Sequence, residues 1–170
     1  EESRKPEISS DIALPGTGNE IVAIGESAVA LYSPERSSIM TYNTKGQMTH
    51  EHAVSESPLV HDHKGVFGAQ VADLPHNMTW FDGKRLYLFL PSTMTVSQEF
   101  DDAIGTGIAL SEQLIYPTES GLNVADWDTG KVIRKISVDR NGYSGPVSLG
   151  FTGNTIIEKR GNELVGLMPF

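Results

Sequence analysis

The 170-residue sequence contains no cysteine, which excludes disulfide bonds, thiol catalysis and thiolate metal ligands. Basic residues are few: 13 lysines and arginines stand against 22 aspartates and glutamates, giving a net charge of −9 at pH 7. No run of lysine or arginine provides the clustered cations that a nucleic-acid phosphate backbone requires. No apolar run approaches the ~20 residues of a membrane-spanning helix. These absences predict no nucleic-acid partner and no membrane span.

Helical periodicity is equally scarce, because glycine, proline or serine/threonine clusters break every amphipathic window. Short runs rich in β-branched and aromatic residues recur instead, separated by 17 glycines and 9 prolines. These runs are Ile21–Ile24, Ala28–Tyr32, Ser38–Tyr42, Arg85–Leu90, Gln113–Tyr116, Leu122–Ala125, Val132–Ser137, Thr155–Ile157 and Glu163–Leu167. Many short strands with turns every ~8–12 residues predict an all-β sandwich, barrel or propeller.

A recurring unit favours the propeller among these folds. A tight polar turn followed by a short apolar strand occurs at 25–32, 82–87, 111–116 and 153–157. The equivalent apolar residues Val29, Leu86, Leu114 and Ile156 are separated by 57, 28 and 42 positions. The mean of these steps is close to the ~40–45 residues of one four-stranded blade. Their unevenness indicates that the second copy is out of register or carries an insertion.

One stretch carries a family resemblance. Residues 124–136 read Val-Ala-Asp-Trp-Asp-Thr-Gly-Lys-Val-Ile-Arg-Lys-Ile, which resembles the strand-turn-strand repeat of pyrroloquinoline-quinone-type (PQQ-type) and related WD40-like β-propellers. In this turn Asp126 can accept backbone hydrogen bonds and Gly130 can take a positive φ. Residues 41–47 are a weaker copy. The resemblance implies a fold but not quinone binding, because Ile133–Ile136 stands where quinone-type repeats usually carry a tryptophan.

We therefore predict an extended or disordered leader over residues 1–19 and, over residues 20–170, a β-propeller-like array of about four antiparallel four-stranded blades. The chain begins at Glu1 and ends in an apolar run. We accordingly expect it to be part of a larger propeller, or of one that another copy completes, since closure hides the edges of the sheets. The lack of cysteine and the polar leader suit a bacterial cell-envelope or secreted protein.

The histidines suggest a metal site. Four of the five lie within 14 residues, as the pairs His50/His52 and His61/His63. If residues 48–54 and 59–63 formed a hairpin, all four imidazoles would share one face and could bind zinc or copper. However, the linking loop lacks the Asn-Gly or glycine pair of a tight turn. In the propeller register, residues 47–54 form an outermost strand instead, and the two pairs belong to separate blades.

Other polar and aromatic candidates have structural interpretations. Asp101 and Asp102 are adjacent, so they would face opposite ways and fit a solvated turn. Trp80 and Trp127 fit packing between blades. The sequence thus predicts a non-catalytic binding or scaffolding propeller whose protein or small-molecule partner meets polar loops, such as 126–130 and 138–145, or the central channel. The alternative is a metal-binding module or enzyme that uses His50, His52, His61 and His63.

Overall fold

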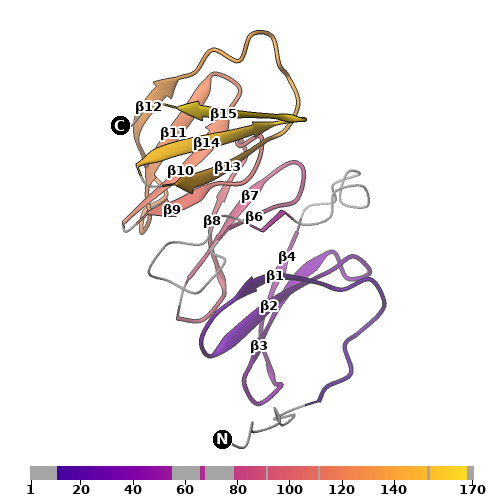
Figure 1. Ribbon diagram of the computed structural model, residues 1–170. Coiled ribbons are helices and arrows are strands. Elements are labelled where there is room, and N and C mark those ends of the chain that lie inside the picture. The colour runs from indigo at the N-terminus through magenta and orange to yellow at the C-terminus, as the bar shows by residue number, and fades with distance from the viewer. Residues whose placement is uncertain are drawn as a thin grey trace, which may run out of the picture.

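The computed structural model describes residues 11–54, 66–67, 79–90, 92–110, 112–152 and 154–167. Every regular element in these ranges is a strand, and the strands form four antiparallel sheets (Figure 1). The described ranges contain no helix that is long and apolar enough to cross a membrane. The predicted all-β, propeller-like array of blades is therefore confirmed.

Each sheet is an up-and-down meander, because its strands are hydrogen-bonded in chain order. Blade 1 contains β1 (Glu20–Ile24), β2 (Ala28–Ser33), β3 (Ser38–Asn43) and β4 (Met48–Ala53). Blade 2 contains β5 (Val66–Phe67), β6 (Thr79–Phe81), β7 (Leu86–Phe89) and β8 (Val96–Phe100). Blade 3 contains β9 (Ile108–Leu110), β10 (Gln113–Thr118), β11 (Gly121–Asp126) and β12 (Val132–Ser137). Blade 4 contains β13 (Val147–Thr152), β14 (Thr155–Arg160) and β15 (Glu163–Leu167).

The repeat predicted from the sequence is present, with one correction. Val29, Leu114 and Ile156 lie on the second strands of blades 1, 3 and 4, as their equivalence requires. Leu86 begins β7, the third strand of blade 2, so its assignment as the fourth equivalent position was wrong by one strand. The second copy is thus out of register, which accounts for part of the uneven spacing.

Two turns share the chemistry that the sequence resemblance suggested. Between β11 and β12, the Asp126 carboxylate accepts hydrogen bonds from the Thr129 main-chain N–H (2.8 Å) and hydroxyl (2.6 Å), and Gly130 has a φ of +68°. These hydrogen bonds hold the pKa of Asp126 below its ordinary value. Between β3 and β4, Asn43 accepts two main-chain hydrogen bonds at 3.0 Å, and Gly46 has a φ of +74°. A side-chain oxygen that holds the turn and a glycine that closes it are therefore common to both blades.

The blades pack against one another through two apolar clusters. The larger cluster joins blades 1, 2 and 3, and within it Trp80 packs between Tyr32 and Tyr87 with ring centroids 5.1 and 5.5 Å apart. The smaller cluster joins Ile108, Ile115, Leu122 and Val124 of blade 3 to Val147, Leu149 and Ile156 of blade 4. Trp80 and Trp127 both belong to the larger cluster, which confirms their predicted role in packing between blades.

The two flanks of the array differ. On blade 1, Leu14 from the segment before β1 packs against Leu31, Met40 and Tyr42, all of which are buried. On blade 4, Leu164 pairs with Lys159 on the face of the sheet that points away from blade 3, and its side chain is 74% exposed. One flank is thus covered by the protein's own chain, while the other presents an uncovered apolar side chain.

Candidate functional site

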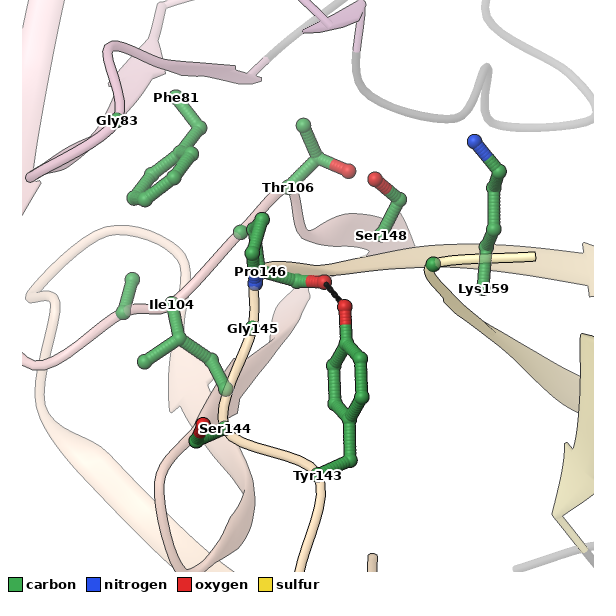
Figure 2. A pocket seen from close by; sticks show the side chains of 13 residues that line it. Phe81, Gly83, Ile104, Thr106, Tyr143, Ser144, Gly145, Pro146, Ser148 and Lys159 are labelled. Atoms are coloured by element: carbon green, nitrogen blue, oxygen red, sulfur yellow. Dashed lines mark hydrogen bonds between the residues drawn. The ribbon is translucent and has the colours of Figure 1, made fainter. Parts of the chain in front are cut away.

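The topology brings connections from three blades to one end of the array. In an up-and-down sheet the second and fourth strands run in the same direction, so the chain leaves both at the same end. The β6–β7 and β14–β15 turns leave second strands, and the β8–β9 and β12–β13 connections leave fourth strands. These four connections surround a cleft of about 380 Å³, which we call the loop-end cleft (Figure 2).

The loop-end cleft combines three polar groups with an apolar wall. Thr106 and Ser148 contribute hydroxyls that Figure 2 shows turned toward each other, and the ammonium of Lys159 extends beside them. Phe81 and Ile104, both half-buried, form the apolar wall. Thr106 is buried, whereas Lys159 is exposed and lies at the solvent side. The cleft can therefore offer hydrogen bonds, one positive charge and an apolar surface to the same ligand.

The walls of the cleft are fixed by close backbone contacts. A Cβ atom added to Gly105 would lie 1.5 Å from the carbonyl oxygen of Val147, so the β8–β9 connection sits directly against β13. The main-chain N–H of Val147 donates a 3.0 Å hydrogen bond to Ile104 at the same point. In the β12–β13 connection, the Tyr143 hydroxyl donates to the Pro146 carbonyl at 2.8 Å. The cleft is thus preformed by the fold.

The described side chains of the loop-end cleft supply hydroxyls, one ammonium group and apolar surface. The described residues that line the cleft include no histidine, aspartate or glutamate. The polar groups of the cleft are suited to recognising a ligand by hydrogen bonds and charge.

The histidines of β4 lie where the propeller register predicted them. β4 is an edge strand of blade 1 and pairs with β3 alone among the described strands. His50 and His52 stand opposite Thr41 and Ile39, which places both imidazoles on one face. Together with residues of blade 2 they line a pocket of about 220 Å³. The Nε2 atom of His52 is 2.5 Å from a carboxylate oxygen of Glu99 on β8, so this histidine contacts the neighbouring blade.

The four-histidine metal site is not assembled within the described part of the chain. His61 and His63 lie outside the described residues. Among the residues that are described, no group of three histidine, aspartate or glutamate side chains is placed to hold a metal ion. Glu51, between the two histidines of β4, turns to the opposite face and accepts two hydrogen bonds of 2.8 Å from Arg36. A zinc or copper site at His50, His52, His61 and His63 therefore stays a prediction.

Asp101 and Asp102 have separate structural partners. Asp101 forms an ion pair with Arg85, with its Oδ1 atom 2.5 Å from Nε. Asp102 accepts hydrogen bonds from the Tyr116 hydroxyl (3.1 Å) and the Asn123 amide (2.9 Å). Burial, with a contribution from Asp102, raises the pKa of Tyr116 to about 12. The two carboxylates lie in an exposed turn and do not act as a pair, as the sequence predicted.

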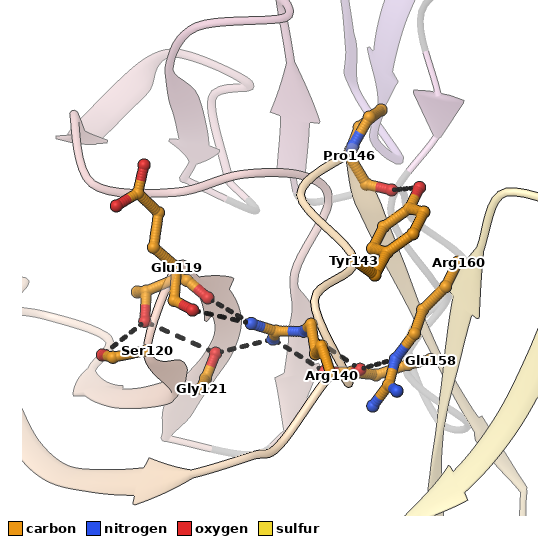
Figure 3. A network of polar contacts seen from close by, with 9 residues as sticks. Glu119, Ser120, Gly121, Arg140, Tyr143, Pro146, Glu158 and Arg160 are labelled. Atoms are coloured by element: carbon orange, nitrogen blue, oxygen red, sulfur yellow. Dashed lines mark hydrogen bonds and ion pairs between the residues drawn. The ribbon is translucent and has the colours of Figure 1, made fainter.

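A buried charge network between blades 3 and 4 was missed by the sequence analysis (Figure 3). Glu158 on β14 is fully buried and accepts hydrogen bonds from Arg140 at 3.2 and 2.8 Å and from Arg160 at 2.7 Å. Arg140 also donates to the main-chain carbonyls of Thr118 (2.6 Å), Glu119 (3.3 Å) and Gly121 (2.9 Å), which lie around the β10–β11 turn. The β12–β13 connection, which carries Arg140, is thereby tied to both blades.

Comparison with known proteins gives no family assignment. No protein-family model matches the chain, and no curated protein sequence matches it. Among solved structures, the chain is similar to BamB from Moraxella catarrhalis, with 13% sequence identity and a TM-score of 0.42. The match covers 81% of this chain and 46% of BamB, so the chain spans less than half the length of that protein.

Proposed function

We propose that the chain is a non-catalytic binding or scaffolding β-propeller module, whose partner occupies the loop-end cleft. The observation that supports this proposal is the convergence of connections from three blades on one preformed cleft of about 380 Å³. Its volume lies within the range of about 300–1,000 Å³ that is usual for ligand sites. Ligand sites also combine an apolar lining with a few placed polar groups, as this cleft does.

The charge of the cleft indicates what the partner carries. Lys159 is the one charged side chain among the described lining residues, and it belongs to a chain of net charge −9. An isolated cation in an acidic surface favours a ligand with a local negative group, because the rest of the surface repels such a group. We expect the partner to be a protein segment or small molecule that pairs an acidic or carbonyl group with an apolar one.

A displayed random-peptide library, selected on the immobilised protein, tests this function. Ser148→Trp fills the cleft, Lys159→Glu reverses its charge, and Thr152→Trp is the matched control, on the same face of the same strand but outside the cleft. We expect enriched peptides to bind the unmodified protein and Thr152→Trp with similar micromolar affinity, and to lose binding to the other two variants. Peptides that bind Ser148→Trp equally well, or no enrichment at all, would contradict the proposal.

A metal-binding role at the histidines is the second candidate. It is favoured by the shared face of His50 and His52 and by the contact of His52 with Glu99. Calorimetric titration with zinc and copper, on the unmodified chain and on the His50→Ala/His52→Ala double variant, tests it, with His76→Ala as the control. We expect a metal site to bind one ion tighter than micromolar and to be lost only in the double variant. Weak binding that is unchanged in the double variant would eliminate this role.

Location and assembly also belong to the proposal. We propose that the protein works in the bacterial cell envelope or outside the cell, and that further blades or a second copy complete the ring. Fractionation of cells that express the full-length coding sequence tests the location. Sedimentation at several protein concentrations tests the second copy, since self-association depends on concentration.

A further inference from the structure

The structure points to a second binding site, distinct from the loop-end cleft, in the pocket of about 350 Å³ between blades 3 and 4. We propose that this pocket binds a monocarboxylate attached to a short apolar group, and that Arg160 recognises the carboxylate. We refer to it as the Arg160 pocket.

Arg160 is buried yet only partly satisfied. Its side chain is 6% exposed, and its Nε–H donates to Glu158 at 2.7 Å. Figure 3 shows the two terminal nitrogens of the guanidinium directed away from Glu158, and neither has a hydrogen-bond acceptor among the described residues. The residue is buried, but these two nitrogens are not among the fully buried polar atoms of the described chain, so they open onto the pocket. A guanidinium edge held in a largely buried position forms strong hydrogen bonds with an ionised acceptor. These nitrogens therefore mark a place for an acceptor supplied from outside the chain.

The walls around Arg160 are mainly apolar. Ile136 and Val138 come from the end of β12 and the residue that follows it, and Val165 and Leu167 come from β15. Val165 pairs with Glu158 and Leu167 with Ile156, so both face blade 3 on the same side of the sheet as Arg160. A ligand whose negative group meets Arg160 would thus rest its remaining atoms on branched aliphatic side chains.

The local charges favour a ligand with one negative charge. Glu158 is shared between Arg140 and Arg160, so the network carries two positive charges and one negative charge. Glu163 stands opposite Arg160 on β15 and adds an exposed carboxylate on the same face, which also disfavours a dianion. Asp139 also lines the pocket, and its carboxylate is held by the main-chain N–H of Asn141 at 2.8 Å rather than by Arg160. A dianion such as phosphate would be repelled by Asp139, whereas a carboxylate can accept two parallel hydrogen bonds from the free edge of the guanidinium.

Two sources can supply this chemistry: a free short-chain branched acid, or the C-terminal carboxylate of a peptide that ends in an apolar residue. Isovalerate represents the first source, and acetyl-Ala-Val-Leu with a free C-terminus represents the second. Isovaleramide and the peptide amide are the matched neutral ligands, and inorganic phosphate tests the preference for a monoanion. Each is titrated into the full chain while the Arg160 Nε–H and the valine and leucine methyl resonances are followed by NMR.

Three variants assign the effect to the pocket. Arg160→Gln removes the guanidinium, and Asp139→Asn removes the repelling charge while keeping the oxygen that accepts from Asn141. Asp128→Asn is the matched control, since Asp128 is an exposed aspartate in another turn. Asp139→Asn leaves the buried network intact. If Arg160→Gln does not fold, the affinity of Asp139→Asn for the acids therefore still tests the pocket.

We expect the acids to bind and the amides not to bind. Affinity should fall about tenfold or more in Arg160→Gln and rise about threefold in Asp139→Asn, with no change in Asp128→Asn. A peptide acid that binds at least about tenfold tighter than isovalerate identifies a chain terminus as the natural ligand, and equal affinities identify a free acid. The proposal is overturned if neither acid binds at tens of millimolar, if the amides bind equally, if phosphate binds more tightly than isovalerate, or if Asp139→Asn matches Asp128→Asn.

Discussion

Replacing Glu158 with glutamine would remove the negative charge that two arginines share between blades 3 and 4. The side chains of Glu158, Arg140 and Arg160 are 0%, 5% and 6% exposed, so little water can take over the interactions that Glu158 makes. Glutamine has nearly the same shape as glutamate and keeps one acceptor oxygen, but it places an amide N–H₂ against a guanidinium. Two buried positive charges would remain without a counter-charge.

The expected cost follows from the number and kind of interactions lost. Three hydrogen bonds, of 3.2, 2.8 and 2.7 Å, join Glu158 to the two arginines. Hydrogen bonds to charged groups contribute about 1.5–3 kcal/mol each, and breaking a buried ion pair by removing one partner costs about 3–5 kcal/mol. Because glutamine can retain one of these hydrogen bonds, we expect Glu158→Gln to lose about 3 kcal/mol of unfolding free energy, the lower end of that range.

Urea unfolding followed by far-UV circular dichroism and by tryptophan fluorescence measures this loss. Glu112→Gln is the matched control, because Glu112 is an exposed glutamate in the β9–β10 turn, away from the network, and it should change stability by no more than about 0.5 kcal/mol. Trp80 and Trp127 lie outside blade 4, so loosening of blade 4 alone would appear in the dichroism before the fluorescence. If Glu158→Gln and Glu112→Gln unfold at the same urea concentration with the same slope, the network does not hold the two blades together.

Three further predictions concern the core and the cleft. Because burial raises the pKa of Tyr116 from 10.0 to about 12, its stabilising contribution is complete below pH 10 and is lost as the pH rises through about 12. Tyr116→Phe should therefore flatten the fall of the urea midpoint over this pH window, and an unchanged slope would contradict the assignment. Gly105→Ala should lower the free energy of unfolding in urea by about 2 kcal/mol or more, since its Cβ would lie 1.5 Å from the Val147 carbonyl oxygen. Gly150→Ala is the control: its Cβ would have no atom within 4 Å, so the free energy of unfolding should change by no more than about 0.5 kcal/mol. Trp80→Phe removes a buried indole N–H that has no hydrogen-bond partner among the described residues. It should therefore cost about 1 kcal/mol in the same assay, rather than the about 3–5 kcal/mol of Trp→Ala, and a loss above about 3 kcal/mol would refute this.

The strands that could be predicted are those with alternating or β-branched residues between well-defined turns. Val132–Ser137 and Glu163–Leu167 were predicted to the residue, because Thr-Gly and Gly-Asn turns precede them. β6 and β9 have three residues each and β5 has two, which is too few to show a period of two. Their position is set by pairing with neighbouring strands, which is information that a local pattern does not contain.

The candidate site was predictable only in part, for a related reason. The sequence identified 138–145 as an accessible polar loop, but not that it meets the β8–β9 connection and Lys159, because that depends on which strand ends share one end of the array. The buried network did leave a signal. Ile156, Glu158 and Arg160 are alternate residues of β14, so the two charged side chains lie on the same buried face of the strand as the core residue Ile156. A charge at an inward position requires a partner, and Arg140, 18 positions earlier, provides it.

The unequal flanks give the array a direction. Leu14 shields blade 1, whereas Leu164 on the outward face of blade 4 is 74% in contact with solvent. Transient opening should therefore start at β15 and spread inward blade by blade, so that amide protons exchange fastest there and slowest in the strands around Trp80. Another apolar surface that docked on blade 4 would therefore slow amide exchange there more than docking on blade 1 would.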